Sequence, residues 1–316
     1  MAPKILVVSP SAEVAEIARE MAPKGFETVI IGDSEVVASL PNTEYMVCYP
    51  HVPMKDAFYK AVPKLKLVQL LSAGYDNVDL EAARRAKVPL SNNGGANAIS
   101  VSEHAMMLML TVARKVVWQH ASVSGGRWRG NGPAPRMYEL HDKTLGIIGF
   151  GTIGKKVARL AQPFGMHVQY FDIARLSEGE ADRHNVKFRL LRELLRTSDV
   201  VSLHVPLNDS TRHMIGKEEL ELMKPNAIIV NTSRGPVIDE AALCAHLAAG
   251  KIFGAGLDVF DQEPLPASHA LTKLDNVVLA PHTASATREA RGAMSRLAAE
   301  NVIAALEDRP LPSEVS

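Results

Sequence analysis

Short apolar runs alternate with amphipathic segments along the first part of the chain. The runs that predict buried strands are KILVVSP at 4–10, then ETVIIG, EYMVCYP, LKLVQLLS and VPLSNN. Between them, SAEVAEIAREMAPKG at 11–25 and VDLEAARRAK at 78–87 space their apolar residues at helical intervals, and the first closes on Gly25, a typical helix stop. This alternation predicts a parallel sheet covered by helices.

The next segment, NAISVSEHAMMLMLTVARKVV at 97–117, predicts one long and largely buried helix. Ser100 and Glu103 have the spacing of a capping box, which would place them at the start of this helix. A loop rich in glycine and proline follows at 124–135.

A second alternation of strands and helices begins at residue 143. Its six strand-like runs are TLGIIG, HVQYFDI, VVSLHVP, AIIVNTS, FGAGLDVF and NVVLAPH. Six strands complete a dinucleotide-binding domain, and a final helix at about 286–307 follows them.

The chain therefore predicts two α/β domains. We expect residues 1–98 and 286–316 to form a discontinuous substrate domain with a flavodoxin-like fold, and residues 99–285 to form an NAD-binding domain. The second domain should contain the doubly wound parallel sheet of the Rossmann type. A cleft between two domains is a common place for a ligand.

Composition narrows the class of protein. The 316 residues include 35 basic and 35 acidic side chains, so the formal net charge is zero and nothing predicts binding to nucleic acid or to an anionic membrane. The longest apolar run, near 105–110, is far shorter than a membrane span of roughly 20 residues. Cys48 and Cys244 are too few for a disulfide framework or a zinc site, and the N-terminus lacks a signal-peptide pattern. We expect a soluble cytoplasmic protein without a metal.

Gly149, Gly151 and Gly154 form a G-x-G-x-x-G motif between the strand-like LGII and a helical segment. The motif alone is weak, but this context is the one that dinucleotide binding requires. Gly149 permits the tight turn, Gly151 lets the backbone approach a pyrophosphate, and Gly154 allows close packing of helix on strand. The helix N-terminus would attract the phosphates.

Asp172 lies 21 residues after Gly151, close to the spacing of about 20 for the acid that binds the ribose of NAD. A carboxylate there repels the extra phosphate of NADP, so we expect NAD in preference to NADP, although Arg175 could weaken that preference. Two alternatives remain at this point. The glycines could form an ordinary turn with Asp172 as a helix cap, and a methyltransferase also uses a glycine-rich turn and a ribose-binding acid.

Three polar residues follow successive strands of the second domain. Arg234 follows AIIVNTS, Glu263 lies beyond GAGLDVF, and His282 follows VVLAP. Carboxyl ends of parallel strands share one edge of a sheet, so these side chains could converge at a nicotinamide. Arg234 could bind the carboxylate and carbonyl of a 2-keto acid, His282 could transfer a proton, and Glu263 could hold the imidazole and favour its charged form.

Each of these residues is, taken singly, more often structural than catalytic. His204 in SLHVPL occupies a similar strand end, and the pattern does not separate it from His282.

Longer stretches resemble the D-isomer-specific 2-hydroxyacid dehydrogenase family, whose members include phosphoglycerate dehydrogenases and hydroxypyruvate/glyoxylate reductases. The resemblance covers nearly the whole chain and rests on SAGYDNVDLEAA, NAISVSEHAMMLML, LGIIGFGTIG, LHVPLNDSTRHMI, MKPNAIIVNTSRGPVIDEAAL, GAGLDVFDQEPLP and LAPHTAS.

The resemblance implies that Arg234, Glu263 and His282 are the catalytic residues, and that His204 belongs to a strand-end motif. It implies substrate binding by Arg234 and His282 together with Ala73, Gly74, Tyr75 and Asn97. It also implies a set of cofactor contacts: Gly149, Gly151, Thr152, Ile153, Gly154, Asp172, Val205, Pro206, Thr232, Ser233, Arg234, Asp258 and His282.

The resemblance implies an NAD-dependent D-2-hydroxyacid dehydrogenase that forms a homodimer through the Rossmann domain. The helix at 97–117 and the loop near 121–142 would take part in the dimer. Formate dehydrogenases of the superfamily pair their histidine with glutamine, so Glu263 favours a hydroxy-acid enzyme.

The substrate stays open among phosphohydroxypyruvate, hydroxypyruvate, glyoxylate and other small 2-keto acids. CYPHVPMK lacks the arginine and small hydroxyl residues of many phosphoglycerate dehydrogenases, which favours a small acid without phosphate. An alternative function is that of the C-terminal-binding-protein corepressors, which use the same fold as an NAD(H)-sensing interaction module.

Overall fold

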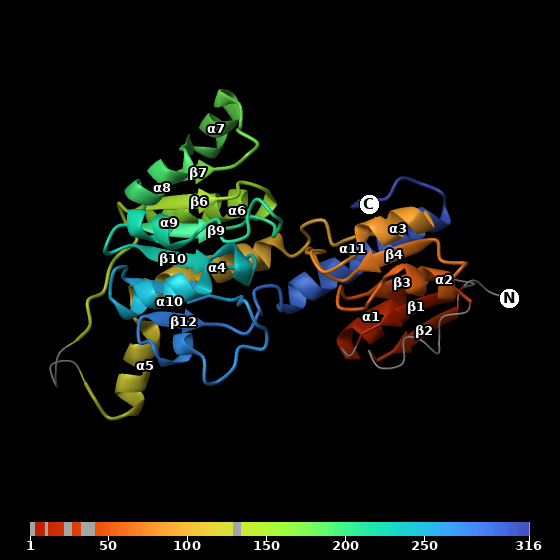
Figure 1. The fold of residues 1–316 in the computed structure, drawn as a ribbon, viewed down its shortest axis with the longest axis horizontal. Helices are drawn as coiled ribbons and strands as arrows, with labels where there is room; N and C mark the ends of the chain where they lie inside the picture. The colour runs from red at the N-terminus through yellow and green to blue at the C-terminus, as the bar shows by residue number, and fades with distance from the viewer. Residues whose placement is uncertain (1–3, 10–11, 22–26, 33–41, 129–133, 316) are drawn as a thin grey trace. The chain divides into compact units, whose positions relative to one another are not determined.

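The computed structural model describes residues 4–9, 12–21, 27–32, 42–128 and 134–315. The chain divides into two compact units (Figure 1). The first consists of Met1–Asn97 and Ala286–Ser316, and the second of Ala98–Ser285. The predicted helix stop at Gly25 and part of the predicted loop, residues 129–133, lie outside the described residues.

The first unit contains a five-stranded parallel sheet in the order β2-β1-β3-β4-β5. This order is that of flavodoxin-like folds, which confirms the predicted fold class. The strands are β1 (Lys4–Val8), β2 (Glu27–Ile31), β3 (Thr43–Cys48), β4 (Leu67–Leu70) and β5 (Leu90–Ser91). The helices are α1 (Ala12–Met21), α2 (Asp56–Ala61), α3 (Leu80–Ala86) and α11 (Arg288–Leu306).

The buried side chains of β1 alternate between two cores. Leu6 and Val8 pack with residues of α2 and α3 on one face of the sheet. Ile5 and Val7 pack with residues of α1 and α11 on the other face. Because successive side chains of a strand point to opposite faces, an uninterrupted apolar run is what a strand covered on both sides requires.

The second unit contains a seven-stranded parallel sheet in the order β12-β11-β10-β9-β6-β7-β8. Counted from β6, this is the 3-2-1-4-5-6 order of a Rossmann fold with one more strand beyond it. The strands are β6 (Thr144–Ile148), β7 (His167–Phe171), β8 (Lys187–Phe188), β9 (Val200–Leu203), β10 (Ile228–Asn231), β11 (Gly254–Leu257) and β12 (Val277–Leu279). The Rossmann prediction is confirmed. The predicted count of six was one too low, because the two residues of β8 are too few to form an apolar run.

Helices cover both faces of the second sheet. Buried residues of α4 and α6 form one core, and buried residues of α8, α9 and α10 form the other. The helices are α4 (Ala98–Ala113), α5 (Val116–Ser124), α6 (Thr152–Ala161), α7 (Glu178–His184), α8 (Leu191–Thr197), α9 (Lys217–Leu222) and α10 (Glu240–Ala248). Short 3-10 turns are η2 (Gln162–Phe164), η3 (Gly235–Val237) and η4 (Ala270–Lys273).

The predicted long helix differs from the structure at both ends. Helix α4 begins at Ala98, so Ser100 is already inside it and the predicted capping box is wrong. The Ser100 hydroxyl donates instead to the Ala284 carbonyl, at 2.6 Å. At the other end the helix stops at Ala113, because Lys115 is left-handed (φ +50°) and its ammonium lies 4.3 Å from the centre of the Phe253 ring.

Helix α4 packs closely on β11 because β11 contains two glycines. A Cβ atom added to Gly256 would lie 2.9 Å from Leu108 Cβ, and one added to Gly254 would lie 2.9 Å from Val112 Cγ1. Both distances are shorter than real side chains tolerate. The two glycines of the FGAGLD segment therefore make room for the helix that crosses the strand.

In the described part of the chain, no helix combines the length and the apolar character needed to cross a bilayer.

We predict that Gly256→Ala destabilises the protein, because the added methyl group overpacks the contact between β11 and α4. Overpacking of this kind costs about 1–3 kcal/mol of unfolding free energy. Gly179→Ala is the matched control, since an added Cβ there meets nothing within 4 Å. Its helical position should tolerate alanine or gain stability. Urea unfolding followed by circular dichroism measures both, and equal midpoints would contradict the prediction.

Candidate active site

Strands β10, β11 and β12 are neighbours in the second sheet, and each is followed by one of the residues singled out from the sequence. Arg234 follows β10, Glu263 lies beyond β11, and His282 follows β12. Since both pairings among these three strands are parallel, the segments that carry these residues leave the sheet at the same carboxyl edge.

His282 and Glu263 are in direct contact. The imidazole Nδ1 lies 2.7 Å from Glu263 Oε2, and both side chains are partly exposed, at 44% and 37%. The other oxygen of Glu263 accepts the backbone N–H of Phe260 at 3.0 Å. Both carboxylate oxygens are thus engaged, and a proton on Nδ1 leaves Nε2 of the imidazole to interact with a ligand.

Arg234 is tied to its own strand end and lies close in the backbone to the Glu263 segment. Its Nη1 donates to the Ser233 carbonyl at 2.7 Å, and the Asn231 amide donates to the Arg234 carbonyl at 2.8 Å. A side chain at Gly235 would collide with the Phe260 carbonyl. The glycine of the Arg-Gly pair therefore permits the close approach of the two loops, because only a residue without Cβ fits there.

The backbone turn that carries His282 is held by Asp258. The Asp258 carboxylate accepts the N–H groups of Thr283, at 2.8 Å, and Ala284, at 2.9 Å. His104 Nε2 lies 3.4 Å from the same carboxylate. Burial alone would raise the pKa of Asp258, but His104 and the two N–H groups outweigh it and hold the pKa below its ordinary value.

His204 has a different environment from His282. Its Nε2 lies 2.9 Å from the Ser202 hydroxyl, and its Nδ1 is buried without a hydrogen-bond partner among the described residues. Burial lowers the pKa of His204 to about 3. The imidazole is therefore neutral near pH 7 and has no proton to give, which separates the two histidines that the sequence pattern left equivalent.

The glycine-rich turn has the geometry that its motif predicts. Gly149 has a φ of +92°, and a Cβ there would lie 2.5 Å from the His204 carbonyl oxygen. A Cβ on Gly151 would meet nothing within 4 Å, whereas one on Gly154 would collide with the Gly149 carbonyl. Thr152 and Ile153 then begin α6, whose N-terminus has no side-chain cap. The turn is closed on the strand side and open beside Gly151.

Asp172 follows β7 and faces this turn. Its Oδ2 accepts the Phe150 N–H at 2.6 Å, and its Oδ1 accepts the Ala174 N–H at 2.9 Å. The Arg175 guanidinium carbon lies 4.8 Å from the centre of the Phe188 ring. The acid is fixed beside the glycines by two backbone contacts, and the arginine rests on an aromatic ring.

The remaining predicted cofactor residues lie at strand ends of the same sheet. Val205 and Pro206 follow β9, and Pro206 is exposed. Thr232 and Ser233 follow β10 and are buried. The hydroxyl of Ser233 donates to Asn231, while that of Thr232 has no hydrogen-bond partner among the described residues.

The predicted substrate residues Ala73, Gly74, Tyr75 and Asn97 all belong to the first unit. The loop that follows β4 is held through its carbonyls. The Ser72 hydroxyl donates to Gly74 O at 2.6 Å, and the Asn92 amide donates to Ala73 O at 2.7 Å. Tyr75 is exposed, and Asn97 is buried with its side-chain oxygen unpaired among the described residues.

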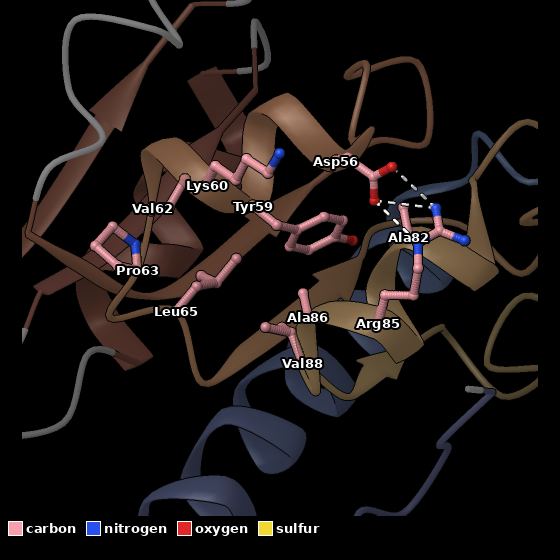
Figure 2. A pocket seen from close by; sticks show the side chains of 10 residues that line it. All are labelled: Asp56, Tyr59, Lys60, Val62, Pro63, Leu65, Ala82, Arg85, Ala86 and Val88. Atoms are coloured by element: carbon pink, nitrogen blue, oxygen red, sulfur yellow. Dashed lines mark hydrogen bonds and ion pairs between the residues drawn. The ribbon is translucent and has the colours of Figure 1, made fainter.

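A cavity of about 450 Å³ lies elsewhere in the first unit, between α2 and α3 (Figure 2). An ion pair between Arg85 and Asp56, at 3.0 Å, stands at its edge. Several lining residues precede β4 or β5, so the cavity is on the amino side of those strands, away from the loop at 73–75. The lining is Asp56, Tyr59, Lys60, Val62, Pro63, Leu65, Ala82, Arg85, Ala86 and Val88.

The fold and the strand-end residues define a nicotinamide-dependent oxidoreductase, and comparison with known proteins specifies the family. A family model described as the D-isomer specific 2-hydroxyacid dehydrogenase, NAD binding domain, matches residues 106–284. A glyoxylate reductase from Korarchaeum cryptofilum is 42% identical over 271 residues, which cover 85% of this chain and 81% of that protein. The chain belongs to the D-isomer-specific 2-hydroxyacid dehydrogenase family and is an enzyme of nicotinamide-linked hydroxy-acid oxidation and reduction.

Similar solved structures contain either cofactor. An NAD-dependent formate dehydrogenase from Staphylococcus aureus, solved with NAD, is 27% identical with a TM-score of 0.85 and covers 99% of both chains. An NADPH-dependent glyoxylate/hydroxypyruvate reductase from Sinorhizobium meliloti, solved with NADP and malonate, is 29% identical with a TM-score of 0.87. That alignment covers 100% of this chain and 97% of the reductase. Family membership therefore leaves the choice between NAD and NADP open.

The neutral state of His204 can be measured directly. A histidine whose folded pKa lies below its unfolded value destabilises the protein as pH falls below about 6.5, because the unfolded chain takes up the proton first. We expect the His204 imidazole nitrogens to show no titration between pH 5 and 8 in two-dimensional NMR, with assignment by His204→Asn. A midpoint between pH 5 and 7 would contradict the assigned environment.

Proposed function

We propose that this enzyme transfers a hydride between a nicotinamide and a small D-2-hydroxy acid or 2-keto acid, with His282 as the proton donor and acceptor. The observation that carries the proposal is the 2.7 Å contact between His282 Nδ1 and Glu263 Oε2. A carboxylate on Nδ1 fixes the tautomer and favours the charged imidazole, so that Nε2 carries the transferable proton. When bound, the nicotinamide supplies or accepts the hydride.

Arg234 would bind the carboxylate and the carbonyl oxygen of the substrate. A guanidinium keeps its charge at any physiological pH and matches a pair of oxygens with two parallel N–H groups. Its approach to the Glu263 loop through Gly235 supports this role. As carbonyl turns into alkoxide during reduction, the guanidinium stabilises the growing negative charge while His282 delivers a proton.

The first unit would supply the rest of the substrate site. In this proposal, residues 1–98 and 286–316 form the substrate domain and residues 99–285 the cofactor domain. Because the carbonyls of Ala73 and Gly74 are tied back, the loop through Tyr75 could direct N–H groups to a carboxylate. The amide oxygen of Asn97 has no hydrogen-bond partner within the described part of the chain, which suits a hydroxyl group of the substrate.

The residues of the second unit suit a dinucleotide. The open side of the turn at Gly151 and the uncapped first turn of α6, at Thr152 and Ile153, fit a pyrophosphate. The buried hydroxyl of Thr232, which has no partner in the residues that the structure describes, fits a polar group of the nicotinamide end. We assign the remaining contacts to Gly149, Gly154, Asp172, Val205, Pro206, Ser233, Arg234, Asp258 and His282.

We propose NAD as the preferred cofactor. Asp172 presents a carboxylate beside the turn, where the ribose hydroxyls of the adenosine would lie. Its negative charge disfavours a ribose phosphate. Arg175 is the residue that could bind such a phosphate, but its guanidinium stacks on the Phe188 ring, and this contact favours a conformation in which it does not bind the phosphate.

A small 2-keto acid without phosphate is the proposed substrate class, with glyoxylate and hydroxypyruvate as the first candidates. The Korarchaeum relative is a glyoxylate reductase and the Sinorhizobium relative is a glyoxylate/hydroxypyruvate reductase, which supports these two substrates. Phosphohydroxypyruvate is disfavoured because the segment CYPHVPMK offers no arginine to a phosphate.

We also propose a homodimer formed through the Rossmann domain. Helix α5 carries several exposed apolar side chains, including Val117 at 61% and Trp118 at 38%. A face of this kind on a helix of the cofactor domain is typical of a surface that a second copy covers. In this proposal the segment at 121–142 also takes part in the dimer; its residues 129–133 lie outside the described residues.

A substrate panel tests the proposed reaction. We expect NADH oxidation with glyoxylate or hydroxypyruvate, and a loss of at least a hundredfold in kcat for His282→Ala, because general acid catalysis contributes about 10²–10⁴-fold. His167→Ala changes an exposed histidine at the start of β7 and is the matched control. Cofactor binding without turnover on any 2-keto acid would contradict the proposal and favour an NAD(H)-sensing interaction module.

The cofactor preference depends on Asp172. In Asp172→Asn we expect the KM for NADH to rise by about tenfold, because a hydrogen bond to a charged group contributes roughly 1.5–3 kcal/mol. The KM for NADPH should stay unchanged or fall, since the repulsion is removed. Asp182→Asn on the exposed face of α7 is the control. Equal changes with both cofactors would refute the assignment.

Sedimentation equilibrium tests the dimer. We expect a molecular mass near twice the 34.2 kDa of one chain, and dissociation in Val117→Asp because a buried charge is costly. Leu190→Asp places the same charge on an exposed apolar residue outside this face and should leave the dimer intact. A monomeric wild-type protein would contradict the proposal.

A further inference from the structure

Four residues of α4 lie along one face of the helix, because they are four positions apart. They are Ser100, His104, Leu108 and Val112. In the described structure Val112 and Leu108 lie over glycines of β11, His104 lies beside Asp258 directly after β11, and Ser100 donates to Ala284 in the turn after β12. The first two contacts are apolar and the last two are polar.

The apolar contacts set the register between the helix and the strand. Val112 lies over Gly254 and Leu108 lies over Gly256, at distances that leave no room for a side chain on either glycine. A helix advances about 6 Å in four residues, and a strand advances about 6.6 Å in two. The next pair in this register is His104 with Asp258, whose facing atoms lie 3.4 Å apart.

Asp258 connects His104 to the turn after β12 through hydrogen bonds. Its carboxylate accepts the N–H groups of Thr283 and Ala284, and its own carbonyl accepts the N–H of His282 at 2.8 Å. Ser100, one helical turn before His104, donates to the carbonyl of Ala284 at 2.6 Å. Helix α4 therefore holds the turn twice, directly through Ser100 and indirectly through His104 and Asp258.

The turn needs such support because its backbone is strained. His282 has a φ of +53°, in the left-handed region. A residue with a side chain pays of order 1–3 kcal/mol for that conformation, and it persists only where surrounding contacts enforce it. In this conformation the imidazole contacts Glu263 at 2.7 Å. A turn that relaxed would redirect the imidazole.

We propose that His104 is a positioning residue for the reaction, acting through Asp258 on the backbone turn that aims His282 at Glu263. The inference rests on the proposed function, in which His282 transfers the proton. Ser100 supports the same turn from the preceding helical position. At 3.4 Å the contact of His104 with Asp258 is electrostatic, so its effect depends on the N–H of the imidazole and on the negative charge of the carboxylate.

Among the described residues of the second unit, three titratable groups contact this turn or lie directly behind it. Glu263 contacts the imidazole of His282, Asp258 contacts the backbone N–H groups, and His104 lies behind Asp258. Only Glu263 touches the proton donor itself. A change at His104 can therefore alter the pH dependence of the reaction only through the geometry of the turn.

The test compares pH profiles for reduction of the best 2-keto acid by NADH. Reduction needs a protonated donor, so kcat falls as pH rises through the midpoint of the profile. Glu263→Gln removes the anionic partner and should shift this midpoint to lower pH. In His104→Leu we expect a smaller shift in the same direction and an approximately tenfold lower kcat, with the KM for NADH changed less than twofold.

Two variants control for a simple loss of packing. His104→Gln keeps an N–H donor near the position of Nε2 and should restore most of the wild-type profile. Glu103→Gln alters the neighbouring exposed residue of α4 and should leave kcat and the midpoint unchanged. Should His104→Leu fail to fold, Ser100→Ala replaces it, with a shift in the same direction expected.

The double variant His104→Leu/Glu263→Gln gives the sharpest result. If His104 acts through the pair of His282 and Glu263, the double variant should shift the midpoint no further than Glu263→Gln alone. Additive shifts, or an unchanged profile in His104→Leu, would overturn the inference while leaving the proposed function intact. An unchanged profile in Glu263→Gln would overturn the proposed function and the inference together.

Discussion

The Asp258 carboxylate, buried and bound by the N–H groups of Thr283 and Ala284, is the interaction on which the geometry of the site depends. It joins the end of β11 to the turn after β12. It also explains why a residue with a side chain can occupy a left-handed conformation at His282. Without this anion the N–H of the buried Ala284 would lose its acceptor and the Thr283 N–H would lose its hydrogen bond, so the contacts that hold the turn would be gone.

Glycines set the distances between the elements that surround this site. Gly254 and Gly256 allow α4 to pack closely on β11. Gly235 allows the Arg234 loop to approach the Glu263 loop, and Gly149 allows the glycine-rich turn to approach the end of β9. In each case an added Cβ would collide with a neighbouring atom. The carboxyl edge of the second sheet is thus built by close contacts between backbone segments, and the polar side chains occupy the positions that these contacts leave.

Much of the fold and the position of the candidate site could be predicted from the sequence, because these features depend on local patterns of residues. Apolar runs marked every strand of both sheets except β8, and the glycine motif marked the glycine-rich turn before α6. Three polar residues after successive strands predicted the edge at which Arg234, Glu263 and His282 emerge. Strand order follows from the topology of a recognised family, and both sheet orders agree with it.

The remainder depends on contacts between distant segments, which no local pattern contains. Ser100 and Glu103 match a capping box, but tertiary packing starts α4 earlier and gives the Ser100 hydroxyl to Ala284. His204 and His282 follow strands in similar sequences, but in the structure His204 is buried beside Ser202, whereas His282 is partly exposed and contacts Glu263. The contact of His104 with Asp258 is visible in sequence only as a polar residue at four-residue spacing from Leu108 and Val112 on an apolar helix.

A crystal structure of the enzyme with NAD and oxamate, an unreactive analogue of a 2-keto acid, tests the central claim most directly. The account predicts the oxamate carbonyl oxygen within hydrogen-bond distance of His282 Nε2 and of the Arg234 guanidinium, with Nδ1 still on Glu263 and the Asp258 contacts unchanged. An imidazole turned away from the bound oxamate, or oxamate bound without Arg234, would contradict it.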